Sequence, residues 1–86
     1  MPQISRFFGI IIAMYFDDHN PPHFHAKYGD FEALISIKNF SVIEGQIPSR
    51  ALGMVIEWAS MHQNELMVNW NNAIENKSLD KIEPLK

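Results

Sequence analysis

The sequence predicts an α+β fold, in which an antiparallel β-meander of three to four strands carries one long C-terminal amphipathic helix. Three observations predict it. The N-terminal run is apolar and strand-like, a tight-turn signal separates two alternating segments, and the hydrophobic period lengthens from about 2 to about 3.6 residues after Arg50. With 86 residues, the chain has room for a single domain over residues 1–86.

The first predicted strand covers about residues 4–16, which are rich in Ile and Phe. Both alternating faces of this run are apolar, as in a strand that is covered on both sides. Gly9 leaves a gap in one face, where we expect a bend or a closely approaching backbone. The strand ends at residues 17–22, because the two prolines in this segment cannot donate to a ladder.

The next two predicted strands, about residues 23–28 and 31–38, flank the two-residue loop Gly29-Asp30, which is typical of a tight hairpin. This loop sets a register with one apolar face, formed by Tyr28 opposite Phe31, Ala26 opposite Ala33, and Phe24 opposite Ile35. The other face is polar, with Lys27 opposite Glu32, His25 opposite Leu34, and His23 opposite Ser36. A shift of one residue would mix the two faces. A further short strand is predicted at about residues 42–47.

The helix is predicted over about residues 50–75. Its apolar stripe consists of Leu52, Val55, Ile56, Ala59, His62, Leu66, Trp70 and Ile74. We expect this stripe to pack on the sheet and His62 to be a core or boundary histidine with one hydrogen bond. The C-terminal tail, residues 79–86, is expected to dock on the sheet, with a short edge strand as one option.

Charge and composition argue against several classes of protein. The net charge is −3, and the seven Lys and Arg residues are scattered, so the charge does not support nucleic-acid binding, although a fold can still gather scattered charges. The N-terminus does not resemble a signal peptide, and its apolar run is too short to span a membrane. The chain has no cysteine, which fits a reducing compartment. We therefore expect a cytoplasmic protein without a membrane segment.

Three histidines lie within seven residues, at His19, His23 and His25, directly after Asp17 and Asp18. On a strand, His23 and His25 point to the same face, and two imidazoles at this spacing can share a metal ion with a carboxylate such as Asp18. The third and fourth ligands of a stable site are missing elsewhere in the chain. We therefore expect no bound metal and no other cofactor.

The same histidines are also candidate catalytic residues for metal-free cleavage of RNA. An imidazole titrates near neutral pH and serves as general acid or general base. Lys27, on the same face, is the candidate cation for a phosphate, with Arg6 or Arg50 as alternatives. Ordinary strand histidines that face Ser36 and Leu34 explain the same pattern without any chemistry.

A candidate binding surface lies on the predicted helix, where Trp58 falls away from the centre of the apolar stripe. Together with Met54 and Met61, it would form a partly exposed apolar patch, and such patches often bind protein partners. Methionine also fills gaps in cores, so a purely structural role stays open for these residues.

Four blocks of the sequence resemble the prokaryotic family called domain of unknown function 4160. They are MPQISRFFGI at residues 1–10, DDHNPPHFHA at 17–26, EWA at 57–59 and IEPL at 82–85. The resemblance implies a small bacterial protein, often encoded beside a member of another family of unknown function, number 2442. Because that arrangement is similar to toxin–antitoxin pairs, it implies a protein partner. It assigns no catalytic residue.

The sequence thus leaves two functional hypotheses. The first is a cytoplasmic protein-interaction module, one half of a two-protein toxin–antitoxin-like system, whose partner is a small protein encoded next to it or a second copy of the chain. The second is a ribonuclease or hydrolase, histidine-based or metal-assisted, that uses His19, His23 and His25. A catalytic site should gather these histidines with an acid or base in a cleft, whereas a binding module should leave them exposed to solvent.

Overall fold

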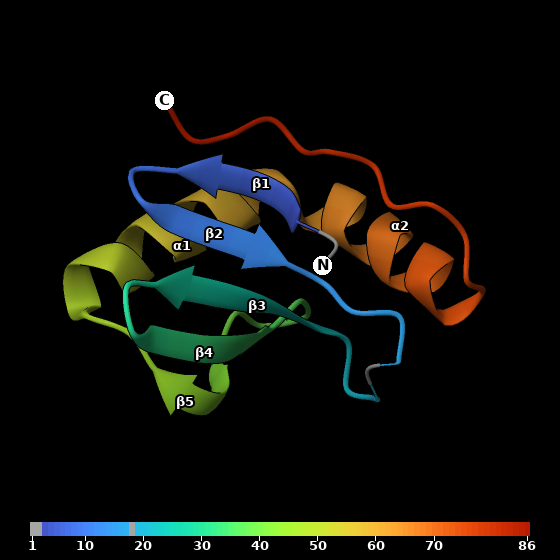
Figure 1. Cartoon of the computed structure of the whole chain (residues 1–86), viewed down its shortest axis with the longest axis horizontal. Helices are drawn as coiled ribbons and strands as arrows, with labels where there is room; N and C mark the ends of the chain where they lie inside the picture. Colours follow the sequence, from blue (N-terminus) through green and yellow to red (C-terminus); the bar gives the residue numbers. More distant parts are fainter. Residues whose placement is uncertain (1–2, 18) are drawn as a thin grey trace.

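A computed structural model describes residues 3–17 and 19–86 and shows two layers, a sheet and a pair of helices that cover one of its faces (Figure 1). The strands are β1 (Gln3–Phe7), β2 (Ile10–Ala13), β3 (His23–Tyr28), β4 (Phe31–Ser36) and β5 (Val42–Gln46). The helices are α1 (Ser49–Met61) and α2 (Gln63–Ile74). The α+β fold is therefore confirmed, with five strands instead of three to four and with two helices instead of one.

The sheet is an antiparallel meander in which the five strands follow their order in the sequence, β1-β2-β3-β4-β5. The predicted hairpin register between β3 and β4 is confirmed at every pair, including Lys27 with Glu32 and Phe24 with Ile35. Its apolar face is buried in the core, where Phe24, Ala26, Ala33 and Ile35 have no exposed surface. The opposite face of the sheet, which we call the outer face, points away from the helices.

The prediction of one strand over residues 4–16 is wrong, because the chain reverses at Phe8 and Gly9 and forms β1 and β2. Both residues have positive φ angles, 49° and 80°. A tight hairpin turn of the type I′ kind requires this backbone at both central residues, and glycine adopts it without strain. The gap at Gly9 was therefore the signal of a turn between two short strands.

The prediction of one helix over residues 50–75 is also wrong, because His62 leaves the helical region with φ −129° and ψ 24°. The side-chain amide of Gln63, directly after the break, donates to the backbone oxygen of Ile37 over 2.7 Å. The buried residues also differ from the predicted stripe. They are Ala51, Val55, Trp58 and Ala59 in α1, and Leu66, Asn69, Trp70 and Ala73 in α2. Of the predicted stripe, Ile56 is half-buried and Ile74 is exposed.

The tail docks beside β1, as expected, but it does not form a strand. The Ile82 N–H donates to the Ile4 carbonyl over 2.8 Å, and Ile82 itself is buried. The Trp58 indole N–H donates to the Glu83 carbonyl over 2.8 Å, and the Asn69 side chain makes two hydrogen bonds to the Asp80 backbone. The tail therefore covers the β1 edge of the sheet and is held there by both helices. No helix in the described part of the chain has the length and apolar character needed to cross a membrane.

Candidate functional site

The polar candidates from the sequence come together on the outer face of the sheet, where the strand register places them in rows. One row runs across all five strands and contains Arg6, Ile11, Lys27, Glu32 and Gln46. The next row contains Gln3, Ala13, His25, Leu34 and Glu44. A third pair, His23 with Ser36, lies beside it. The predicted same-face arrangement of His23 and His25 is confirmed.

The two strand histidines are nearly buried and hydrogen-bonded. His25 Nδ1 donates to a Glu32 carboxylate oxygen over 2.8 Å, and the basic lone pair of a neutral ring then lies on Nε2. His23 Nδ1 donates to the Pro21 carbonyl over 2.8 Å. The two imidazole centroids are 5.3 Å apart, and His23 also packs against Trp70 of α2, at 5.2 Å. Both side chains are thus oriented by fixed partners, whereas His19 is exposed. The three histidines match neither the exposed set expected of a binding module nor the complete cluster expected of a catalytic site.

Tyr15 is a member of this cluster that the sequence analysis did not identify. It follows β2, and its ring meets the edge of the His25 ring at a centroid distance of 4.6 Å. Its hydroxyl accepts a hydrogen bond from Lys27 Nζ over 2.5 Å. This hydrogen bond raises the pKa of Lys27 above its ordinary value of 10.5, against the opposing effect of burial, and the charge of Glu32 adds to the increase. Little in the sequence indicated this contact, because Tyr15 falls on an apolar face of the long strand predicted over residues 4–16.

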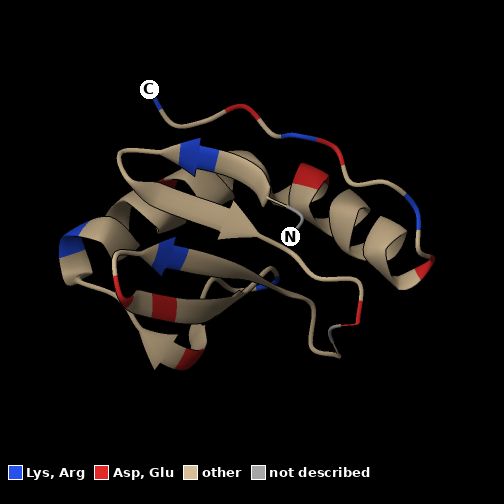
Figure 2. Cartoon of the chain, in the orientation of Figure 1, with Lys and Arg blue, Asp and Glu red and all other residues tan. Residues whose placement is uncertain are grey.

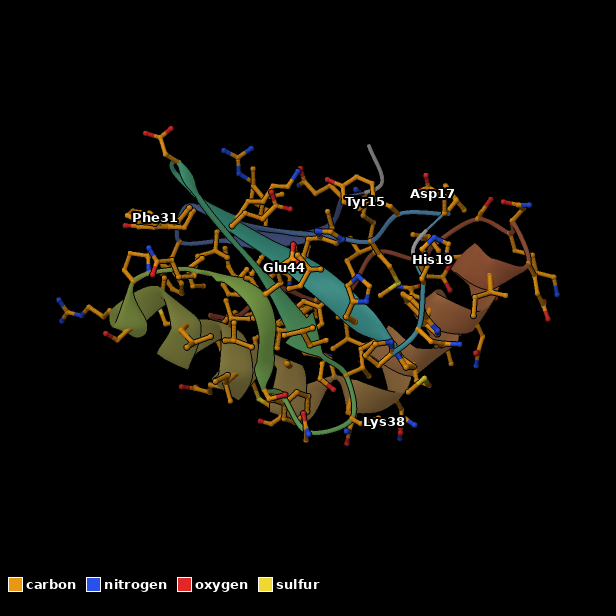
Figure 3. All side chains as sticks on the ribbon, turned by 90° about the horizontal axis from the view of Figure 1, so that it is seen from below. Tyr15, Asp17, His19, Phe31, Lys38 and Glu44 are labelled. Carbon is orange, nitrogen blue, oxygen red and sulfur yellow. The ribbon has the colours of Figure 1, made fainter. Side chains whose placement is uncertain are left out.

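The remaining candidates for a metal or acid–base site lie in the loop between β2 and β3. His19 and Asp17 are both exposed. In the view of Figure 3 they lie between Tyr15 and the ribbon of α2. Asp18, the candidate carboxylate ligand, lies outside the described residues. Within residues 3–17 and 19–86, no group of three His, Asp or Glu side chains is placed to hold a metal ion. The structure therefore brings His23, His25 and Lys27 together and leaves His19 apart.

The three candidate binding residues on the helix differ in how far they are buried. Trp58 was expected at a partly exposed surface, but it is fully buried, with its ring 5.4 Å from Phe7 and 6.0 Å from Phe24. Met54 is half-buried, whereas Met61 is 58% exposed at the end of α1. The predicted stripe was centred on the wrong side of α1, because the helix buries Ala51, Val55 and Trp58, which lie three or four residues apart on one face. His62 is half-buried, as predicted, and its Nδ1 donates to Glu65 over 2.6 Å.

A second feature that the sequence analysis missed is the open edge of the sheet at β5. All five residues of Val42–Gln46 are exposed, including the apolar side chains of Val42 and Ile43. In the described part of the chain, β5 pairs with β4 alone. The sequence indicated a strand here, but it did not indicate that this strand would be the last in the sheet.

The charges on the sheet are separated by strand. Figure 2 shows basic residue positions on β1 and β3, and acidic ones on β4, on β5 and in the turn between β3 and β4. By residue, these are Arg6 and Lys27 on one side, and Asp30, Glu32 and Glu44 on the other. The two strands at the open edge, β4 and β5, therefore carry acidic residues without basic ones, while Lys38 lies in the turn that joins them.

Comparison with known proteins gives one family match. The sequence model of the family described as domain of unknown function (DUF4160) matches residues 9–71. The matched range contains the histidine cluster and the open edge at β5, whereas the tail lies beyond it. No curated protein and no solved structure matches the chain.

Proposed function

The chain belongs to the family of domain of unknown function DUF4160, and on this premise we propose that it is a protein-interaction module that binds its partner through the open edge of β5. The partner in this proposal is a small protein encoded next to it, and the two form a cytoplasmic toxin–antitoxin-like pair.

The observation that carries the proposal is the difference between the two edges of the sheet. At the β1 edge, the tail supplies a backbone hydrogen bond to Ile4 and a lysine hydrogen bond to the Gln3 carbonyl. At the β5 edge, the outward N–H and C=O groups of the strand face solvent beside two exposed apolar side chains. Exposed edges of this kind can pair with another strand. Two features of β5 limit such pairing, an irregularity at Ile43 and the charge of Glu44, so a partner strand has to accommodate both.

A test compares two exposed isoleucines. Ile43 in β5 is 42% exposed and Ile74 at the end of α2 is 55% exposed, so replacing either with lysine should alter the fold little. A lysine on an edge strand discourages pairing with another strand. We expect Ile43→Lys to weaken binding to the protein encoded next to it by about tenfold or more, a loss of about 1.4 kcal/mol. Ile74→Lys should leave binding unchanged.

The measurement is isothermal titration calorimetry with the purified protein encoded next to it, after circular dichroism has shown that both variants are folded. Equal affinities for wild type and Ile43→Lys would refute the role of β5. A complex that is lost with Ile74→Lys and kept with Ile43→Lys would place the interface on the helices, around the exposed Ile74.

A second candidate function, histidine-based cleavage of RNA, is favoured by the 2.8 Å contact between Glu32 and His25. A carboxylate that holds Nδ1–H fixes the imidazole with its base on Nε2. In this mechanism His25 accepts the proton of a ribose 2′-hydroxyl, whose oxygen attacks the phosphorus. The 5′-oxygen leaves with a proton from water, and a 2′,3′-cyclic phosphate remains. Lys27 and Arg6 flank the phosphate.

Removing the general base, His25, should therefore abolish cleavage of RNA. With a fluorescent oligoribonucleotide as substrate, we expect His25→Gln to lower the cleavage rate by about 100-fold or more. His62→Gln is the matched control, since His62 lies at the junction of the helices and contacts Glu65 instead. If the wild-type protein does not cleave RNA, or if both variants cleave it equally well, this candidate is rejected.

A further inference from the structure

The chemistry of the open edge also identifies the kind of partner segment that it fits. We infer that the partner contributes a β-strand that pairs with β5 and places a lysine or arginine opposite Glu44. This inference rests on the proposed interaction function and makes it more specific. It depends on three observations: the position of Glu44 in β5, the charges around Glu44, and the covering of the opposite edge, β1, by the tail.

Glu44 is the central residue of β5 and pairs with Leu34. The irregularity in the β4–β5 ladder lies directly beside this pair, between Leu34 and Ile35. Figure 3 shows Glu44 on the side of the sheet that faces away from the helices. A strand that is added to β5 would therefore place one of its own side chains directly beside this carboxylate.

The charge of Glu44 is not balanced within the described residues, among which no ion pair involves it. The nearby acid Glu32 already contacts His25 over 2.8 Å. The cations of the outer face, Arg6 and Lys27, lie on β1 and β3, which are separated from β5 by β4. A basic residue on an incoming strand would thus meet an acid that has no other counter-charge nearby, whereas an acidic residue would be repelled.

The same geometry disfavours a second copy of the chain as the partner. A symmetric pair of identical antiparallel strands that uses all five residues of β5 is centred on its middle residue, Glu44. Two Glu44 carboxylates would then lie opposite each other, and like charges in that position destabilise a strand pair. Val42 and Ile43 provide exposed apolar contacts beside the charge, so the edge fits an apolar strand with a basic residue near its centre.

The closed β1 edge sets the stoichiometry. Because residues 79–86 lie along β1 and Ile82 donates a backbone hydrogen bond to Ile4, only β5 offers an open ladder in the described part of the chain. We therefore expect one partner strand per molecule and a one-to-one complex.

The experiment uses the full chain and the protein encoded next to it, with charge reversal at two exposed glutamates. Glu44→Lys reverses the charge at the edge, and Glu57→Lys makes the same change on the exposed side of α1. We expect Glu44→Lys to raise the dissociation constant by about tenfold or more, and Glu44→Gln to raise it less. Glu57→Lys should have no effect. Replacing the partner's opposing basic residue with glutamate should restore binding to Glu44→Lys.

The outcomes separate this inference from the proposed function. If the wild-type protein binds its neighbour, and Glu44→Lys and Glu57→Lys bind it equally well, the basic-strand inference is overturned while the interaction function stands. If the wild-type protein does not bind its neighbour, both are overturned. If light scattering shows that the protein alone forms a dimer that Glu44→Lys or Glu44→Gln alters, the occupant of the edge is a second copy, and the inference is likewise wrong.

Discussion

Replacing Trp58 with alanine should lower the free energy of unfolding by about 3–5 kcal/mol, the usual cost of removing a fully buried large aromatic side chain. Trp58 has no exposed surface, and its ring contacts Phe7 of β1, Phe24 of β3 and His62 at the helix break. Its indole N–H also holds the tail through the Glu83 carbonyl. The substitution therefore removes packing between the two layers and one attachment of the tail. Urea denaturation monitored by circular dichroism measures the loss.

Two control variants separate these contributions. Trp58→Phe keeps most of the ring packing and removes the hydrogen bond to Glu83, so it should cost less than Trp58→Ala and loosen the tail selectively. Val68→Ala removes an exposed side chain from α2 and should change stability by less than about 0.5 kcal/mol. If Trp58→Ala costs no more than Val68→Ala, the packing of α1 on the sheet described above is incorrect.

Replacing Gly45 with alanine should destabilise the protein by at least about 2 kcal/mol, because β5 cannot accept a side chain at this position. Gly45 has a φ angle of +78°, which residues with a Cβ atom rarely adopt. A Cβ atom there would lie 2.2 Å from the Glu32 carbonyl oxygen, a backbone atom of the neighbouring strand. The strand would have to move away from β4, so we also expect the variant to lose its partner.

Gly53 in α1 is the matched control for this substitution. A Cβ atom at Gly53 would meet no other atom within 4 Å, and alanine is favoured over glycine in a helix by roughly 0.5–1 kcal/mol. The same chemical change should therefore stabilise the protein at Gly53 and destabilise it at Gly45. Urea denaturation curves that shift in the same direction for both variants would contradict the backbone geometry assigned to β5.

The hairpin of β3 and β4 could be predicted from sequence because two independent constraints agree. The Gly29-Asp30 turn fixes the pairing, and that pairing places Phe24 opposite Ile35 on one face and Lys27 opposite Glu32 on the other. The same alternation predicted that His23 and His25 share a face. Local turn chemistry and hydrophobic pattern were sufficient here, and tertiary contacts were not needed.

The errors arose where the pattern was uniform or where a distant contact decides the structure. Residues 4–16 are apolar on both faces, so alternation could not locate the reversal at Phe8 and Gly9. The apolar stripe continues through His62, and the helix break coincides with a long-range contact in which Gln63 reaches the Ile37 and Lys38 carbonyls. Trp58 is buried because α1 turns the face of Ala51, Val55 and Trp58 toward the sheet, beside the stripe that the sequence indicated.

The candidate sites also depend on contacts between distant parts of the chain, which the local sequence does not reveal. The contact of Tyr15 with Lys27 depends on where β2 ends, which the sequence analysis placed incorrectly. The open edge depends on the order of the strands in the sheet and on the position of the tail, and neither is encoded locally in Val42–Gln46. A strand can be predicted from its own residues, but its place at the edge of a sheet is a property of the whole fold.

Amide hydrogen exchange of β5, measured with and without the protein encoded next to it, tests the central claim most directly. Main-chain pairing should slow exchange within Val42–Gln46 on complex formation, while Gln3–Phe7 of β1 serves as the internal reference, because the tail already lies along that strand. The account predicts new protection in β5 and none in β1. A complex in which β5 exchanges as fast as in the free protein, with protection gained on the helices instead, would contradict it.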